Sequence, residues 1–230
     1  MKTKIYKANS RGHAVYDWLD THYSFSFADY YNPDRVHFGN LRVLNDDIIK
    51  AGTGFGRHPH DNMEIITIPV AGQLTHKDSM ENEQRIKVDE VQVMSAGTGI
   101  FHSEYNNSDE DANTLQIWIL PKYRNIKPTY HQAWFDPADA LNKWQFLVNG
   151  GNSPLQINQD ARISRIRLNA GTNVNYSFLP NAYGSFLFVV EGKIDISGQL
   201  INSRDAIEIT GSSEYELKAV EESFVINIEI

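Results

Sequence analysis

Residues 115–120 read LQIWIL, a run of aliphatic, β-branched and aromatic residues that is too short for an amphipathic helix. Runs of the same kind recur along the chain and are separated by Gly, Asn, Asp and Pro. They are LRVL (residues 41–44), EIITI (64–68), VQVM (91–94), FLFVV (186–190) and FVINI (224–228). Short strands divided by turn residues are typical of a β-sandwich or a β-barrel. The sequence therefore predicts an all-β, antiparallel fold with few short helices.

A weak internal repeat divides the chain into two halves. PVAGQL (residues 69–74) and VVEGKI (189–194) each read as a strand, a Gly turn and a second strand. Between the halves, DPADAL (136–141) offers an Asp N-cap, a Pro at the first helical position and good helix formers. Such a repeat favours two similar β-barrels in tandem. We expect an N-terminal barrel over residues 1–134 and a C-terminal barrel over residues 135–230.

The composition excludes several classes of site. The 230 residues include no Cys, which excludes disulfides, thiolate zinc sites and iron–sulfur clusters. Lys and Arg number 21 against 29 Asp and Glu, a formal net charge of −8, so we expect no direct binding of nucleic acid. No stretch is apolar and long enough to span a membrane, and the first residues lack the apolar core of a signal peptide. We expect a soluble cytoplasmic protein without a membrane partner.

Four side chains stand out as a potential metal site. His58 and His60 are two residues apart, as are His102 and Glu104. Residues two apart in a strand share a face, so two such strands lining a barrel would bring all four side chains together. Three neutral imidazoles and one carboxylate suit a divalent transition metal and leave open positions for a substrate or O₂.

The residues around these four extend the pattern. Residues 52–64 contain G-x5-H-x-H-x3-E and residues 99–106 contain G-x2-H-x3-N. These two stretches resemble the two motifs of the cupin superfamily. The chain as a whole resembles the pirin family, and within it the bacterial pirin-like quercetinases. The matching stretches are RGH (residues 11–13), FSFADYY (25–31), LRVLNDD (41–47), GFGRHPH (54–60), MSAGTGI (94–100) and HSEYN (102–106).

The resemblance implies a bicupin fold, made of two tandem double-stranded β-helices. It implies one metal ion in the N-terminal barrel, held by His58, His60, His102 and Glu104. We favour Fe(II), with Zn, Mn, Ni, Co and Cu as alternatives. The implied activity is that of a quercetin 2,3-dioxygenase, in which O₂ cleaves the flavonol ring and carbon monoxide is released. Glu104 would act as metal ligand and as the base that takes the proton of the flavonol 3-hydroxyl.

Other functions and roles stay open at this point. The main alternative is a metal- or redox-responsive regulatory protein that acts through a protein partner, and a third is a cupin isomerase. Glu64 is an alternative carboxylate ligand, although we favour a structural role for it. His76 either lines the pocket or is structural. We expect the aromatic residues around Phe25 and Phe27 to lie in the core. In a less favoured alternative, Phe25 or Phe27 forms part of the wall of an apolar substrate pocket.

The C-terminal half lacks the residues for a second site of this kind. No histidine follows His131. When the Gly72 and Gly192 turns are aligned, Phe178 and Pro180 take the places of the first histidine pair. When Val91 is aligned with Ala206, Leu217 and Ala219 take the places of His102 and Glu104. We therefore expect a C-terminal barrel that is packed with apolar side chains and holds no metal.

Overall fold

Twenty-one strands, β1 to β21, and two short 3-10 helices, η1 (Ala8–Ser10) and η2 (Pro137–Ala140), make up the computed structural model, which describes residues 1–230. The strands form four antiparallel sheets, so the prediction of an all-β fold is confirmed. None of the helices has the length and apolar character that a membrane span requires.

The strands fall into two units. The unit that we call the N-terminal barrel consists of Gly12–Phe135 and Leu155–Gln159. The unit that we call the C-terminal barrel consists of Met1–Arg11, Asp136–Pro154 and Asp160–Ile230. The first residues belong to the latter because β1 (Lys2–Tyr6) pairs with β19 along its whole length. Local sequence patterns do not show that a strand at the start of the chain pairs with a strand near its end.

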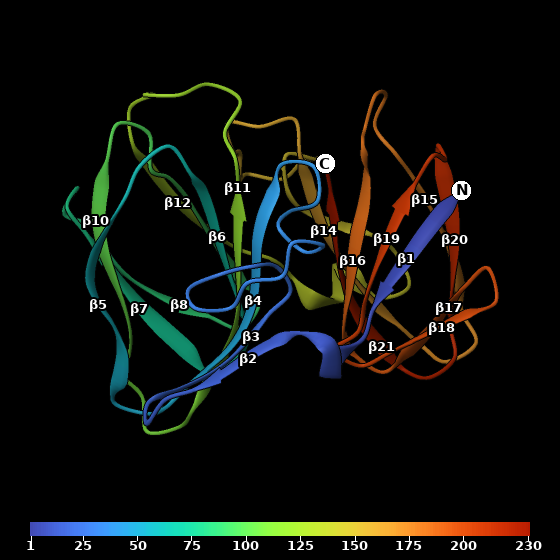
Figure 1. Ribbon diagram of the computed structural model, residues 1–230, viewed down its shortest axis with the longest axis horizontal. Coiled ribbons are helices and arrows are strands. Elements are labelled where there is room, and N and C mark those ends of the chain that lie inside the picture. The colour runs from blue at the N-terminus through green and yellow to red at the C-terminus, as the bar shows by residue number, and fades with distance from the viewer. The chain divides into compact units, whose positions relative to one another are not determined.

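The N-terminal barrel contains two sheets that lie opposite one another (Figure 1). In spatial order the larger sheet consists of β12 (Thr129–Trp134), β9 (Glu90–Ser95), β6 (Glu64–Ala71), β11 (Ala112–Ile119), β4 (Leu41–Ile49), β3 (Leu19–Tyr23) and β2 (Gly12–Val15). The smaller sheet consists of β5 (Thr53–His60), β10 (Ile100–Asn106), β7 (Gln73–Asp78) and β8 (Glu83–Lys87).

The C-terminal barrel repeats this arrangement. Its larger sheet consists of β1, β19 (Ala206–Thr210), β16 (Gly184–Glu191), β21 (Ser223–Glu229), β14 (Arg162–Leu168) and β13 (Gln145–Val148). Its smaller sheet consists of β15 (Asn173–Ser177), β20 (Glu214–Ala219), β17 (Lys193–Ile196) and β18 (Gln199–Asn202). The order β5-β10-β7-β8 therefore corresponds to β15-β20-β17-β18, which is the tandem relationship that the repeat predicts.

The two glycines of the repeat occupy the same turn in each barrel. Gly72 joins β6 to β7 with a φ of 70°, and Gly192 joins β16 to β17 with a φ of 84°. A Cβ atom would lie 2.9 Å from the Cα of Ala112 at the first turn and 2.1 Å from the carbonyl oxygen of Glu222 at the second. Both the backbone conformation and the space therefore require glycine.

The segment expected to be helical is the 3-10 helix η2. The carboxylate of Asp136 accepts a hydrogen bond of 2.9 Å from the backbone N–H of Ala138, so the predicted N-cap is confirmed. The helix has only four residues, and short helical pieces of this kind are usually of the 3-10 type.

Apolar side chains fill the C-terminal barrel. Leu217 and Ala219 on β20 are completely buried in its core, and Phe178 packs against the same cluster. The interior positions of the N-terminal barrel are more polar, and they include His102 and Glu104 on β10. The two barrels thus share a topology and differ in what they enclose.

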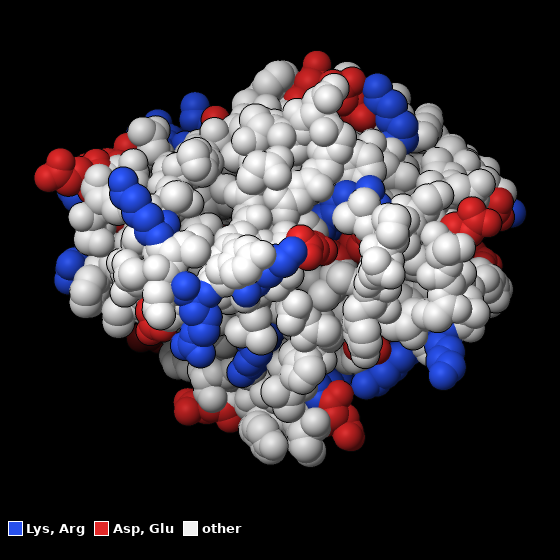
Figure 2. Space-filling model, turned by 90° about the horizontal axis from the view of Figure 1, so that it is seen from above, with Lys and Arg blue, Asp and Glu red and all other residues white.

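Charged side chains of both signs occur on the face shown in Figure 2, and neither sign forms a continuous belt across it. This mixed surface agrees with a modest net charge of −8 spread over 230 residues.

Candidate metal centre

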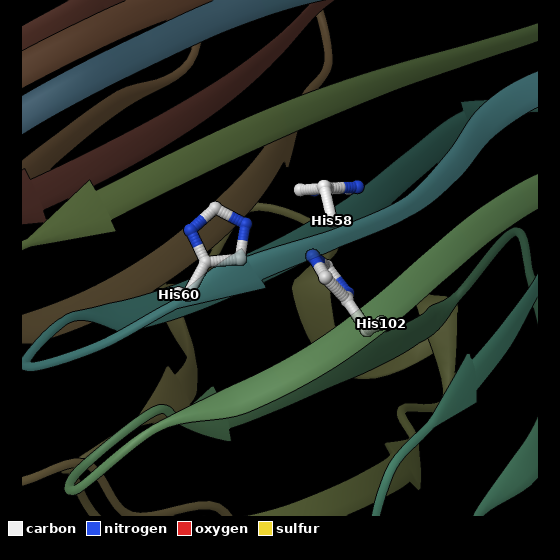
Figure 3. A group of neighbouring side chains, drawn as sticks. All are labelled: His58, His60 and His102. Atoms are coloured by element: carbon white, nitrogen blue, oxygen red, sulfur yellow. The ribbon is translucent and has the colours of Figure 1, made fainter.

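Three histidines converge in the N-terminal barrel. His58 and His60 come from β5, and His102 comes from its neighbour β10, where it stands directly opposite His58. One ligand nitrogen from each residue lies within 4.8 Å of those of the other two. The three rings face one another (Figure 3), with centroids 4.4 Å apart for His58 and His102 and 4.9 Å apart for the other two pairs. These imidazoles could hold a metal ion.

An irregularity in strand pairing sets the position of His58. His102 pairs with His58, but Glu104 pairs with Phe55, so β5 has one extra residue at this point. Such a β-bulge re-aims side chains relative to a regular strand. Beside it, the Nδ1 atom of His58 lies 2.7 Å from the carbonyl oxygen of Gly56. Because a carbonyl can only accept, Nδ1 carries the proton and the lone pair of His58 is on Nε2.

A chain of hydrogen bonds holds His102 in a defined tautomer. The carboxylate of Asp78 accepts from Nε2 of His76 at 2.9 Å. In a neutral His76 the other nitrogen, Nδ1, is then an acceptor, and it lies 3.4 Å from Nδ1 of His102. His102 therefore donates through Nδ1, and its lone pair is on Nε2. That Nε2 atom is buried and has no hydrogen-bond partner, which is the environment of a metal-ligating nitrogen.

Burial keeps two of the imidazoles neutral at neutral pH. Burial and the neighbouring imidazoles His102 and His58 lower the pKa of His60 to about 4. Burial, His58 and His76 lower the pKa of His102 to about 3. A metal ligand must be deprotonated, so these residues are ready to bind an ion without first losing a proton.

Glu104 lies on the same strand as His102 and is 3% exposed. Its carboxylate accepts two hydrogen bonds from Nε2 of Gln116, at 2.8 and 3.1 Å, and one of 3.1 Å from the hydroxyl of Thr67. These donors fix the plane of the carboxylate. Glu104 faces the same pocket as His58 and His60, outside the tight group formed by the three imidazoles.

The pocket beside the histidines has a volume of about 280 Å³. Its walls are mostly apolar and carry a few polar groups at one end. They are formed by Leu19, Thr21, Tyr23, Phe27, Asn45, Asp47, Phe55, His58, His60, Glu104, Gln116 and Trp118. An apolar cavity with a few converging polar groups is typical of a small-molecule site.

Asp47 is a second buried carboxyl group in this pocket. It is 3% exposed and accepts a hydrogen bond from the hydroxyl of Thr21. Burial raises the pKa of Asp47 to about 7, although the Thr21 hydrogen bond acts in the opposite direction. The pocket thus contains a carboxyl group that can change its protonation state near neutral pH.

The structure also places the residues whose roles the sequence left open. Oε2 of Glu64 accepts hydrogen bonds from the hydroxyl of Ser95 and from the backbone N–H of Asn158, while its Oε1 is buried without a partner. Glu64 lies outside the histidine group and does not line the pocket. His76 lies behind His102 and stacks on Tyr130, with ring centroids 4.6 Å apart.

The aromatic residues of the N-terminal segment have separate positions. Phe27 lines the pocket, where its ring meets that of Trp118 edge to face at 5.3 Å. Phe25 is 1% exposed and lies in the core instead.

Several pocket residues were missed by sequence reasoning. They come from strands that read as core, and they are Thr21 on β3, Asn45 and Asp47 on β4, and Gln116 and Trp118 on β11. A usable signal was present, because Asn45, Asp46 and Asp47 are three consecutive polar residues in a strand that is otherwise rich in aliphatic residues, so at least one of them must face the interior. Polar groups on the buried face of a strand need partners or a function.

Two family models match the chain. Residues 4–119 match the model described as Pirin, and residues 148–230 match the model described as Quercetinase C-terminal cupin domain. This chain belongs to the pirin family. The three histidines of this pirin lie in the region that matches the first model, and the second match begins at the last residue of β13.

Individual relatives agree with this assignment. A protein of Escherichia coli K12 named quercetin 2,3-dioxygenase is 39% identical over 223 residues, which cover 96% of this chain and 95% of the relative. A pirin-like protein of Caulobacter vibrioides is 37% identical over 221 residues, 95% of each chain. Among solved structures, bacterial pirin YhhW of E. coli in complex with nickel(II) matches with a TM-score of 0.93 and 37% identity and covers 100% of this chain and 99% of that one.

Proposed function

We propose that this pirin is a metal-dependent dioxygenase that opens the central ring of a flavonol with O₂ and releases carbon monoxide. The observation that carries the proposal is the convergence of three imidazoles, two of which line an apolar-walled pocket that also contains a carboxylate. The name of the E. coli relative, quercetin 2,3-dioxygenase, supports the choice of substrate class.

We further propose that His58, His60, His102 and Glu104 hold the metal ion. The donor set fits such an ion, because His102 has a buried nitrogen without a partner and the imidazoles of His60 and His102 are neutral at neutral pH. Three imidazoles and a carboxylate suit Fe(II) and the other first-row divalent ions. When bound, the metal supplies Lewis acidity and open positions for the substrate oxygen and O₂.

The protein's own groups would bind and orient the substrate. Phe27, Phe55 and Trp118 provide aromatic surfaces for a flat phenolic ring system, and they exclude water from the space between them. Glu104 takes the proton of the flavonol 3-hydroxyl at its carboxylate. Gln116 and Thr67 hold that carboxylate in place through their hydrogen bonds. The flavonolate then takes up both atoms of O₂, and one ring carbon leaves as carbon monoxide.

Aerobic turnover of quercetin by metal-loaded protein tests the proposal. We expect loss of the flavonol absorbance together with release of carbon monoxide, and no turnover by the His58→Ala/His102→Ala double variant. His37→Gln is the matched control, because His37 lies outside both the histidine group and the pocket. Glu104→Gln should bind quercetin but turn it over much more slowly, since it cannot accept the proton.

Two results would contradict the proposal. One is turnover no faster than that of free metal, and the other is full turnover in the double variant. If the protein instead captured a defined protein partner in a metal-dependent way and took up no oxygen with any phenol, a regulatory binding protein would be favoured over an enzyme.

A further inference from the structure

A second group of metal-ligating side chains lies on the hairpin formed by β2 and β3. It consists of His13, Asp20 and His22, and one ligand atom of each lies within 4.8 Å of those of the others. The Nε2 atom of His13 is 2.8 Å from the carboxylate of Asp20, and the Nδ1 atom of His22 is 3.6 Å from the same oxygen. We propose that this group, which we call the hairpin site, binds a divalent transition-metal ion independently of the pocket.

Strand register brings the three side chains to one face. His13 on β2 stands directly opposite His22 on β3, and Asp20 precedes His22 by two residues on the same strand. The two imidazole rings stack with centroids 4.1 Å apart and an interplanar angle of 15°. Because side chains alternate along β3, Thr21 and Tyr23 point to the other side, where they line the pocket. The hairpin site is therefore separated from the pocket by the sheet itself.

The hairpin holds these donors on a rigid frame. β3 is paired with β2 on one side and with β4 on the other, and the backbone N–H of Tyr16 bonds to the carbonyl of Leu19 to close the turn. Trp18 in the turn packs edge to face on Phe55, with centroids 4.9 Å apart. A ligand set on paired strands is better fixed in position than one on a loop, so little entropy is lost on binding.

The start of β2 is fixed as tightly. A Cβ atom at Gly12 would lie 2.4 Å from the ring of Tyr30, so the backbone next to His13 is packed directly on an aromatic ring. This close approach limits how far His13 can move away from His22.

The donor chemistry determines which ions fit. Two imidazoles and one carboxylate suit Zn²⁺, Ni²⁺ and Cu²⁺, and three protein ligands leave a zinc ion one position for water. The side chains of His13, Asp20 and His22 are 47%, 42% and 32% exposed, so an ion can reach them without any opening of the fold. Asp46, the register partner of His22 on β4, lies on the same face but is buried and accepts a hydrogen bond from the amide of Asn113, so it is not counted among the donors.

The simpler reading of this group is an ion pair between a protonated His13 and Asp20. An exposed pair of that kind needs only one histidine and contributes little to stability. It does not account for the second imidazole, which is stacked on the first and has its own nitrogen directed toward the same carboxylate oxygen. The proposal requires all three donors.

Equilibrium dialysis of the full chain against Zn²⁺, followed by elemental analysis, tests the proposal. We expect the His13→Gln/His22→Gln variant to hold one zinc ion fewer than the unaltered protein. The His58→Ala/His102→Ala variant should lose the pocket ion and keep the ion at the hairpin site. Asp20→Asn should lose the hairpin ion as well, while His37→Gln, a histidine outside both groups, should change nothing.

The hairpin variants alter exposed side chains and are expected to fold, which circular dichroism checks. If the pocket variant does not fold, the comparison between the unaltered protein and the His13→Gln/His22→Gln variant still decides. Equal zinc content in these two proteins would overturn the proposal, as would an equal loss of zinc in His37→Gln. The readout is metal content and not turnover, so the result is independent of the proposed dioxygenase activity.

Discussion

Replacing Asp78 by Asn tests how the fold prepares His102 for a metal ion. One carboxylate oxygen of Asp78 accepts from the backbone N–H groups of Met80 and Asn82, and the other faces His76. In Asp78→Asn the amide oxygen is held by the two backbone donors, so the amide nitrogen faces His76. That nitrogen donates, which moves the proton of His76 from Nε2 to Nδ1. His76 then donates to Nδ1 of His102, and the proton of His102 must move to Nε2, the nitrogen that would bind the metal.

The expected effect is a large loss of metal affinity in a folded protein. Changing the hydrogen-bond partner of a ligating histidine weakens metal binding by about 10–100-fold, or about 1.4–2.7 kcal/mol. The fold should tolerate the change, since the two backbone hydrogen bonds remain. The side-chain amide of Asn82 can also turn so that its oxygen accepts from the new amide nitrogen at position 78. Calorimetric titration with Ni²⁺ gives the affinity, and ¹⁵N chemical shifts of the imidazole rings give the tautomer of His102.

Asp195→Asn is the matched control. Asp195 also accepts a backbone N–H in a hairpin turn, from Gly198 at 2.7 Å, but it lies on β17 in the C-terminal barrel. The reasoning is refuted if Asp78→Asn binds Ni²⁺ as tightly as the unaltered protein while its His102 has changed tautomer. It is equally refuted if His102 keeps its proton on Nδ1.

Three further predictions follow from the same structure. His60→Ala removes one of the proposed donors and should remove the pocket ion while any ion at the hairpin site stays, measured by elemental analysis after dialysis. Leu217→Ala opens a cavity in the apolar core of the C-terminal barrel and should lower the free energy of unfolding by about 2–5 kcal/mol in urea titrations, with an unchanged metal content. A drop in metal content as large as that of His60→Ala would contradict the proposed position of the pocket ion in the N-terminal barrel. The third prediction concerns pH. The pKa of His102 falls from 6.5 to about 3 on folding, so between pH 6.5 and about pH 3 the unfolded chain binds this proton and the folded protein does not. The metal-free protein should therefore lose up to roughly 1.4 kcal/mol of stability per pH unit on acidification from this residue, a slope that His102→Gln should lack.

The sequence predicted the parts of the site that depend on spacing alone. His58 and His60 share a face because they are two residues apart, and a similar argument places Glu104 beside His102. Residue spacing does not predict the extra residue in β5, because a β-bulge depends on how the strand pairs with its neighbour. The resemblance to pirins, rather than periodicity, linked the two motifs to one barrel.

Other parts of the site depend on contacts between distant strands. Asp47 and Thr21 are 26 residues apart, and Glu104 and Thr67 are 37 residues apart, yet each pair is hydrogen-bonded. A reading of local patterns predicts strands but not which strands become neighbours. The exchange of β1 into the C-terminal barrel was missed for the same reason.

The corresponding strands β10 and β20 of the two barrels have different surroundings. Along β20, Leu217 and Ala219 are buried in an apolar core, which needs no partners and packs to high density. Along β10, Glu104 is also buried but has a polar carboxyl group, which requires hydrogen-bond donors from β6 and β11. Because Gln116 and Thr67 hold the carboxylate of Glu104 through hydrogen bonds, it keeps its position even though no side chain packs closely on the side that faces the pocket. The open space next to Glu104 is therefore a consequence of the polar network, and a substitution that made the network apolar would be expected to close the pocket as well as to remove the proposed ligand.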